Sequence, residues 1–188
     1  MFSAHDALVL LRACFSAPNI LHILRCSPCA GSERLVRFDK RLRKGLCLIT
    51  NSNLSDSQWT QASLPVRTGG LGIHRVASLA PSTLLACAAS TRTFQSLLRG
   101  LSSPASDPVV DSATAQWSSI HGIPLPDDAL AAEQCVWNAP VIAADKSVIW
   151  SSLTDNQSIA RLLAVSAPHS GDRLHAPASC SMRHGTGR

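Results

Sequence analysis

Two cysteines in this sequence, Cys26 and Cys29, have the spacing of a thiol redox pair or of half a zinc site. Thiolates one helical turn apart can share a sulfur partner or a metal ion. No βαβ pattern surrounds the pair, and no second CxxC or spaced pair of histidines completes four ligands. We therefore expect ordinary half-buried cysteines, and the sequence predicts no metal site and no cofactor.

The adjacent carboxylates Asp127 and Asp128 have the residue type of a polymerase centre, because polymerases hold two metal ions between aspartate side chains. Polymerase aspartates lie in a hairpin between apolar strands. Here they follow Pro124 and Pro126 and precede an Ala-rich segment, where acidic residues favour the positive end of a helix dipole. This setting predicts a helix that begins after Asp127, and no catalytic pair.

A trio of His, Ser and Asp residues and a glycine-rich loop also lack the setting that their chemistry needs. His169, Ser170 and Asp172 are the residue types of a hydrolase triad, but triad members must converge in space, and neighbours in a flexible segment rarely do. Gly69-Gly70-Leu71-Gly72 could cradle a phosphate with its amides, but it lacks the preceding strand and the Lys-Ser or Lys-Thr of such loops. The loop predicts a tight turn between helices, and we expect no catalytic residue.

A row of basic residues is the one pattern with a functional interpretation. The residues recur at helical spacing after a plausible N-cap, Ser32, and form a stripe offset from the apolar positions. Cations along one helix face can contact successive phosphates, and with few aromatic residues nearby such contacts would be independent of sequence. The alternative is an ordinary solvated face. The candidate nucleic-acid-binding residues are Arg34, Arg37, Lys40, Arg41 and Lys44.

Composition favours helices over sheets. The 188 residues are 45% hydrophobic but only 4% aromatic, with no Tyr, while Ala, Leu and Ser are abundant. The segment after Ser32 shows the helical period most clearly, because its apolar residues recur every three or four positions. They are Leu35, Phe38, Leu42, Leu46 and Ile49. We predict an all-α fold.

Pro, Gly and Ser residues suggest where domains begin and end. Residues 100–111 concentrate Pro, Ser, Gly and Asp and predict a linker. We expect a helical domain over 1–99 and a smaller helical domain over 112–165. From 166 to 188 almost no apolar period remains, which predicts a disordered tail.

Local signals place several helices within these domains. Ser55-Asp-Ser-Gln58 matches a capping box and predicts a short helix that contains Trp59. A further helix should run from about 74 to 98 with a bend at Pro81. Beyond the linker, the apolar period predicts helices at about 112–120, 128–137, 141–153 and 156–165.

Charge and cysteine content constrain the surroundings of the protein. The formal net charge is +5, which permits a polyanionic partner without requiring one. Seven cysteines, an odd number, favour a reducing compartment, so we expect nuclear or cytoplasmic residence. The N-terminus lacks the basic region of a secretory signal, and the longest wholly apolar run is far shorter than a membrane span. The sequence predicts no membrane association.

Four segments, in the same order, resemble the region that follows the catalytic palm in reverse transcriptases of non-LTR retrotransposons. The second segment is the most specific, because it combines a Trp, then Leu-Pro-Val-Arg, then Gly-Gly-Leu-Gly. Together the segments cover residues 5 to about 171. They are His5–Arg12 leading to Ile20–Cys29; Leu54–Ile73; Leu79–Ala89; and Arg161–Ala164 with Pro168–Gly171.

The resemblance implies a thumb-like helical segment over 1–99 that follows an RNA–DNA duplex. In that setting Arg37, Arg41 and Lys44 would contact the phosphate backbone, although the match does not extend to those individual positions. The family's palm, with its metal-binding aspartates, would lie before Met1, so the chain would be a catalytically incomplete fragment and no enzyme. After Gly171 the sequence departs from the family.

The alternative is a non-enzymatic helical interaction module. Its apolar surfaces, once packed on the missing palm, would engage a protein partner or a second copy of the chain.

Overall fold

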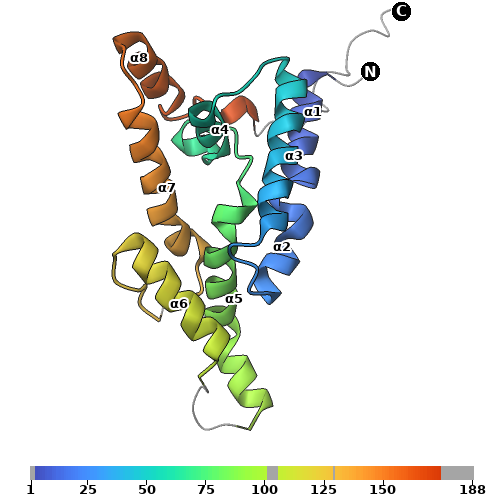
Figure 1. Cartoon of the computed structure of the whole chain (residues 1–188), viewed down its shortest axis with the longest axis vertical. Coiled ribbons are helices and arrows are strands. Elements are labelled where there is room, and N and C mark those ends of the chain that lie inside the picture. Colours follow the sequence, from blue (N-terminus) through green and yellow to red (C-terminus); the bar gives the residue numbers. More distant parts are fainter. Residues whose placement is uncertain (1–2, 101–105, 129, 175–188) are drawn as a thin grey trace, which may run out of the picture. The chain divides into compact units, whose positions relative to one another are not determined.

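The structure, a computed structural model, describes residues 3–100, 106–128 and 130–174. Within these residues it contains helices and turns and no strand, so the all-α prediction is confirmed (Figure 1). The helices are α1 (Ala4–Leu10), followed by a π-helical turn (Leu11–Phe15), α2 (Ala17–Cys26), α3 (Glu33–Thr50), α4 (Asp56–Ser63), α5 (Val76–Leu98), α6 (Pro108–His121), α7 (Gln134–Ser151) and α8 (Asn156–Val165), with short 3-10 turns at Val66–Thr68 and Asp172–Leu174.

The chain divides into two compact units, and segments of the two units alternate along the sequence. The first unit takes its residues from 1–16, 40–74 and 146–188, and the second from 17–39 and 75–145. These boundaries differ from the expected domains at 1–99 and 112–165. The last four residues of the predicted linker, 108–111, form the first turn of α6. The helices on either side, α5 and α6, both belong to the second unit and pack together.

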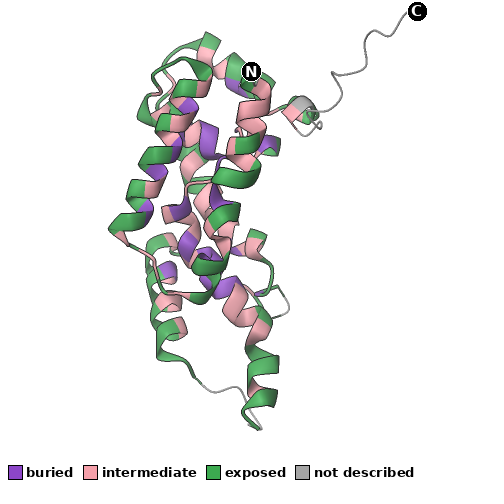
Figure 2. Cartoon of the chain, turned by 90° about the vertical axis from the view of Figure 1, so that its right-hand side faces the viewer, coloured by how far each residue is buried: buried purple, intermediate pink, exposed green. Residues whose placement is uncertain are grey.

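The second unit has two clusters of buried apolar side chains. The first joins α2, α3 and α5, and fully burying a side chain such as Leu24 or Val76 stabilises the fold by about 1.5–3 kcal/mol. The other joins α5, α6 and α7 around Trp117 and Trp137, whose rings meet edge to face with centroids 4.9 Å apart. Buried and exposed residues alternate along the helices, as expected for amphipathic segments (Figure 2).

The first unit is built around the C-terminal half of α3 and the α4 helix. Leu42, Leu46 and Trp59 are buried. The expected capping box at the start of α4 is confirmed, because Ser55 Oγ accepts from the Gln58 amide while Gln58 Oε1 accepts from the Ser55 amide. It fixes the first turn of α4 at the predicted position.

Two helix predictions after residue 112 need correction. Residues 128 and 130–132 form turns, so the helix expected over about 128–137 starts too early, and α7 begins only at Gln134. The pieces expected at 128–137 and 141–153 are joined in one helix that continues through Pro140. Trp137, buried against Trp117, anchors α7 ahead of the proline, and this packing outweighs the local helix-breaking signal.

The expected tail over 166–188 is described only in part. Residues 166–174 form turns that end in the 3-10 turn Asp172–Leu174. Arg12 Nη2 donates to the Leu174 carbonyl at 2.5 Å, and Gly171 lies against Val66. Residues 175–188, to which the disorder prediction also applies, lie outside the described residues.

One helical stretch, Ala4–Cys26, is long and apolar enough to cross a membrane by length and composition, with a mean hydropathy of 1.6. A single stretch of this kind is weak evidence, because core helices and signal sequences share these properties. The absence of membrane association therefore stays a prediction.

Gly70 and Gly45 give a matched test of packing in the first unit. A Cβ at Gly70 would lie 2.0 Å from the Leu64 carbonyl oxygen, so Gly70→Ala must displace backbone and should lower the free energy of unfolding by at least about 1–3 kcal/mol. At Gly45, inside α3, the nearest atom would be Leu11 Cδ1 at 3.5 Å, and alanine should stabilise by about 0.5–1 kcal/mol. Urea unfolding of both variants checks this, and equal effects would contradict the packing described.

Candidate nucleic-acid interface

The five basic candidates lie on the exposed face of α3. On a helix of 3.6 residues per turn they fall within an arc of roughly 120°, and from first to last they extend about 15 Å along the axis. Arg34, Arg37, Lys40, Arg41 and Lys44 are all exposed. On the opposite side Leu35, Leu42 and Leu46 are buried. We call these five residues the basic stripe, and the structure places them on one side of the helix.

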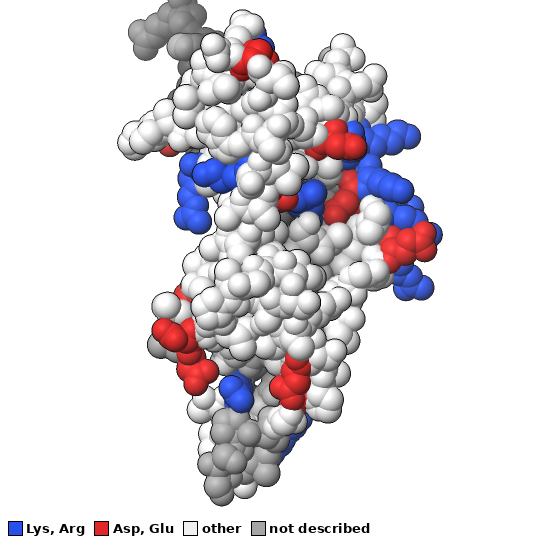
Figure 3. All heavy atoms as spheres, turned by 60° about the vertical axis from the view of Figure 1, so that its left-hand side comes forward, with Lys and Arg blue, Asp and Glu red and all other residues white. Residues whose placement is uncertain are grey.

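The basic stripe is not used for internal contacts in the described part of the chain. No side chain of its five residues makes an ion pair or a hydrogen bond there. Arg43, which lies between Arg41 and Lys44 in the sequence but on another face of the helix, donates to Asp56 Oδ1 at 2.6 Å and to the Leu54 carbonyl. Arg43 therefore joins α3 to the start of α4, and its charge is neutralised. In Figure 3 the largest group of Lys and Arg side chains stands along the right-hand edge, with carboxylates beside it.

Two other side chains share the side of the basic stripe. Glu33 precedes Arg37 by four residues and is exposed, so it offsets part of the positive charge at the N-terminal end. Leu48 follows Lys44 by four residues and is 74% exposed. A ligand along this face would meet cations over most of its length and one apolar side chain at its C-terminal end.

Asp39, which sequence reasoning missed, holds the buried side of α3 in place. Its carboxylate accepts from the backbone amides of Val76 at 2.8 Å and Ala77 at 3.1 Å, the first two residues of α5. Arg75, at the N-cap of α5, makes no capping bond and pairs with Asp145 at 2.5 Å. A carboxylate from another helix thus caps α5. The one sign of this capping role in the sequence is that Asp39 is an acidic residue among the apolar positions of the helix.

The pKa of Asp39 is raised, because burial penalises the carboxylate. The amides of Val76 and Ala77 and the charge of Arg75 act in the opposite direction without cancelling that penalty.

The cysteine and histidine patterns form no metal or hydrolase site in the described residues. Cys26 and Cys29 are free, and burial raises the pKa of the Cys29 thiol, which disfavours the thiolate. His169 Nδ1 lies 3.0 Å from Asp172 Oδ2, but the Ser170 hydroxyl donates to the Val165 carbonyl, not to the histidine. No group of three His, Cys, Asp or Glu side chains comes together within the described ranges.

The glycine-rich loop is a turn whose amides are already bonded. Gly69 and Gly72 have positive φ values of 85° and 71°, which glycine adopts without strain. The amides of residues 69–72 donate to the carbonyls of Val66, Pro65, Ala62 and Leu64 in turn. The loop therefore has no amide left with which to bind a phosphate.

Asp127 and Asp128 precede turns. The Asp127 carbonyl accepts from the amides of Leu130 and Ala131. The expectation that Asp127 starts a helix is therefore wrong, and α7 begins seven residues later, at Gln134.

Comparisons with known proteins identify no relative with which to compare this surface. No protein-family model, curated protein or solved structure matches the chain. The resemblance to reverse transcriptases thus rests on the four sequence segments alone. The basic stripe is supported separately, by its exposure and its free charges.

Removal of the Asp39 carboxylate tests the cap on α5. Asp39→Ala leaves the buried amides of Val76 and Ala77 without an acceptor and should lower the free energy of unfolding by about 1–3 kcal/mol. Glu33→Ala, an exposed acid on the same helix, should change it by no more than about 0.5 kcal/mol. Urea unfolding at pH 7 measures both, and equal losses would argue against the cap.

The raised pKa of Asp39 also predicts a pH dependence. The folded chain binds this proton more tightly than the unfolded chain, so the contribution of Asp39 to stability falls as the pH rises from about 3.8 through the raised pKa. Asp39→Asn keeps one acceptor and cannot ionise. The stability of wild type relative to this variant should therefore decrease between pH 3 and pH 7, and an increase would contradict the burial of the charge.

Proposed function

We propose that this chain is a helical, post-palm segment of a non-LTR retrotransposon reverse transcriptase, without the polymerase centre. We further propose that it binds the phosphate backbone of an RNA–DNA duplex through the basic stripe. The observation that carries the binding proposal is the exposure of all five cations on one face of α3, with none paired in the described residues. A face of this kind can contact phosphates without displacing an internal partner.

The dimensions of the basic stripe suit a few phosphates of one strand. Its length of about 15 Å lets it follow a short stretch of the backbone of one strand. The side of α3 that carries the stripe has no aromatic side chain, since Phe38 lies on the apolar side and is half-buried. We therefore propose contacts with the backbone only, independent of base sequence.

Free thiols fit the compartment that we propose, the nucleus or the cytoplasm. All six cysteines within the described residues are unpaired. A reducing compartment keeps cysteines in this state.

The alternative function, a protein-interaction module, is supported by the C-terminal turns of α5. Phe94, Leu97 and Leu98 lie at helical spacing and are 61%, 75% and 70% exposed. An apolar face of this kind favours a protein partner or self-association. Size-exclusion chromatography separates the two proposals, because salt-resistant oligomers without duplex binding would favour the interaction module, and a nucleic-acid-binding monomer would favour the first.

Binding of a labelled RNA–DNA duplex across 50–200 mM salt tests the basic stripe. The wild-type affinity should fall linearly on logarithmic axes, with a slope of about −0.9 for each phosphate contacted. Replacing Arg37, Arg41 and Lys44 together by Ala should weaken binding at low salt and reduce the slope by up to about 2.7. Fluorescence anisotropy measures both quantities.

A charge-matched variant controls for net charge. Arg25, Arg92 and Arg99 are exposed and lie outside α3, so replacing these three by Ala removes the same charge and should leave most of the affinity. An equal loss in both triple variants would mean that only net charge matters. Wild-type affinity that is absent at 50 mM salt, or insensitive to salt, would exclude phosphate contact.

A further inference from the structure

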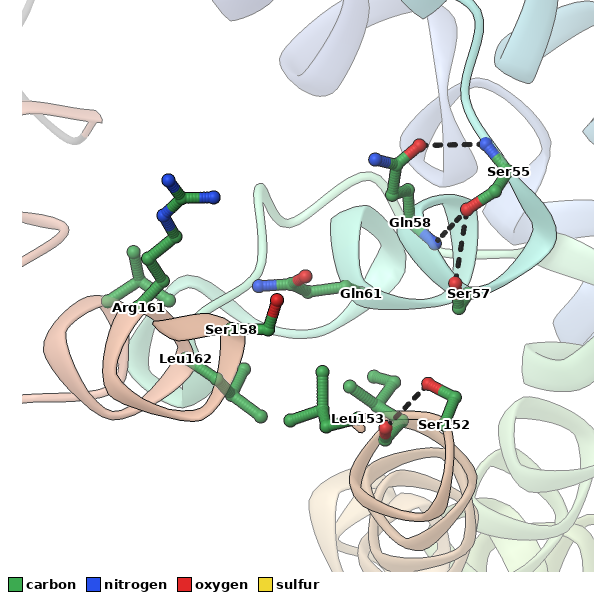
Figure 4. A pocket seen from close by; sticks show the side chains of 11 residues that line it. Ser55, Ser57, Gln58, Gln61, Ser152, Leu153, Ser158, Arg161 and Leu162 are labelled. Carbon is green, nitrogen blue, oxygen red and sulfur yellow. Dashed lines mark hydrogen bonds between the residues drawn. The ribbon is translucent and has the colours of Figure 1, made fainter. Parts of the chain in front are cut away.

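Two depressions in the structure differ in the side chains that line them. The one in the first unit, between α4, the C-terminal end of α7 and α8, holds polar side chains such as Gln61 and Arg161 beside leucines (Figure 4). The other, of about 400 Å³, lies in the second unit between the loop after α2, α5 and α6. Prolines and aliphatic side chains supply most of its lining, and none of its lining residues is ionisable. We call it the α5–α6 depression, and it suits an uncharged, apolar occupant.

The C-terminal turns of α5 present an apolar side chain of a suitable size. Phe94 is exposed, together with Leu97 and Leu98. Figure 1 shows that α5 continues beyond the end of α2, which packs on its N-terminal turns. A cavity of about 150 Å³ holds a benzene molecule, so the α5–α6 depression has room for a phenyl ring.

The spacing of residues along α5 is that of a helix-pairing seam. Five residues recur at alternate steps of three and four and lie within about 80° of one another around the helix axis. They are Leu84, Cys87, Thr91, Phe94 and Leu98, which we call the α5 seam. Leu84 is buried within the chain and lines the α5–α6 depression, while Phe94 stands about 15 Å further along the axis. One helix therefore carries both the depression and the side chain that fits it.

A two-fold axis at the level of Ala89 makes the α5 seam complementary to itself. In an antiparallel pair of α5 helices, residues equally far before and after Ala89 lie opposite each other. Phe94 of one copy then meets Leu84 of the other, and Thr91 meets Cys87. Each contact occurs twice, as in any two-fold interface, so both copies cover an exposed phenyl ring.

The charges of α5 do not oppose this pairing. Between Leu84 and Leu98 the one charged residue is Arg92, which lies about 120° from the centre of the α5 seam around the axis. Ser90 and Gln95, which flank the seam, are uncharged. A second copy therefore brings no like charges together along the helix pair.

Two acids adjoin the α5–α6 depression on α6 but do not line it. Asp107 caps α6 by accepting from the Val109 amide at 2.9 Å, and the Asp111 carboxylate accepts from the Ser106 hydroxyl. Both acids are exposed. They would repel an anionic partner, whereas an uncharged ring meets no such opposition.

We infer that two copies of the chain pair through antiparallel α5 helices, each placing Phe94 in the α5–α6 depression of the other. The α5 seam has five residues in each copy, far fewer than the roughly 20–30 on each side of a standard interface, so the dimer should be weak. None of these residues belongs to the basic stripe. The inference deepens the alternative function, on which it rests, by making the protein partner a second copy of the chain.

Sedimentation equilibrium in reducing buffer tests the pairing. The wild-type chain should shift from monomer to dimer between about 10 and 500 µM, the range of a weak interface. Phe94→Glu should weaken association at least tenfold, because it places a carboxylate against an uncharged lining. Phe15→Glu is the matched control and should have no effect, since Phe15 is also 61% exposed but lies outside α5. A chain that stays monomeric over this range, or equal losses in the two variants, would overturn the inference.

A second pair of variants tests the depression without changing α5. Ser112→Glu puts a carboxylate in the lining from α6 and should weaken association, whereas Ser119→Glu, at an exposed serine of the same helix outside the lining, should not. Equal effects would mean that Phe94 does not enter the depression. Thermal melting confirms that the variants fold.

Disulfide trapping tests the antiparallel register. Thr91→Cys should give a covalent dimer on mild oxidation beyond any formed by wild type, because position 91 lies opposite Cys87 of the second copy. Adding Cys87→Ser should remove it, and Arg92→Cys, directed away from the α5 seam, should not produce it. Antiparallel pairing offsets the two Cys87 residues by about 6 Å along the axis in addition to the distance between the helices. A wild-type dimer linked through Cys87 would therefore show parallel pairing and overturn the proposed register.

Duplex binding is measured separately on the same proteins. Phe94→Glu and Phe15→Glu carry the same charge and should bind an RNA–DNA duplex alike, because both leave the basic stripe intact. Sedimentation without nucleic acid reports the dimer alone, so a missing dimer and a missing duplex contact give different results.

Discussion

The bond between the Asp39 carboxylate and the first amides of α5 fixes how α3 is turned about its own axis. Those amides have no capping side chain of their own, since Arg75 precedes them, and α3 supplies the acceptor. With Asp39 directed to the core, helical geometry turns Arg37, Arg41 and Lys44 roughly to the opposite side. The rotation of α3 that directs Asp39 to the amides of α5 is therefore the same rotation that turns the basic stripe outward.

Local signals in the sequence were sufficient for α3 and for the start of α4. The spacing of Leu35, Leu42 and Leu46 encodes the buried face of α3 directly, and the pair Ser55 and Gln58 encodes a cap within four residues. The cap by Asp39 could not be found in this way, because its partners lie 37 and 38 residues further along the chain. Neither the sequence of α3 nor that of α5 shows by itself that a residue of α3 caps α5.

The early start predicted for α7 and the different division of the chain into units have a related cause. Pro140 is a helix-breaking residue, but a proline removes only one bond, and the packing of Trp137 ahead of it sustains the helix. Residues 100–111 have the composition of a linker, yet composition reports local stiffness and not which helices pack together. Leu85 and Ala86 of α5 pack with Trp117 of α6, so both ends of that stretch belong to one unit.

Arg43 shows why the number of cations does not by itself define a binding surface. Helical spacing places Arg43 outside the basic stripe, about 100° from Lys44 around the axis of α3, but it does not show which group Arg43 contacts. In the structure Arg43 bonds to Asp56 and to the Leu54 carbonyl, so its charge is neutralised by an internal contact. The side chains of Arg41 and Lys44 are exposed to solvent. A phosphate that bound Arg43 would have to displace an internal partner, whereas Arg41 and Lys44 need lose only water and counterions. The distinction between structural and available cations is thus set by tertiary contacts, and it confines the proposed interface to one side of α3.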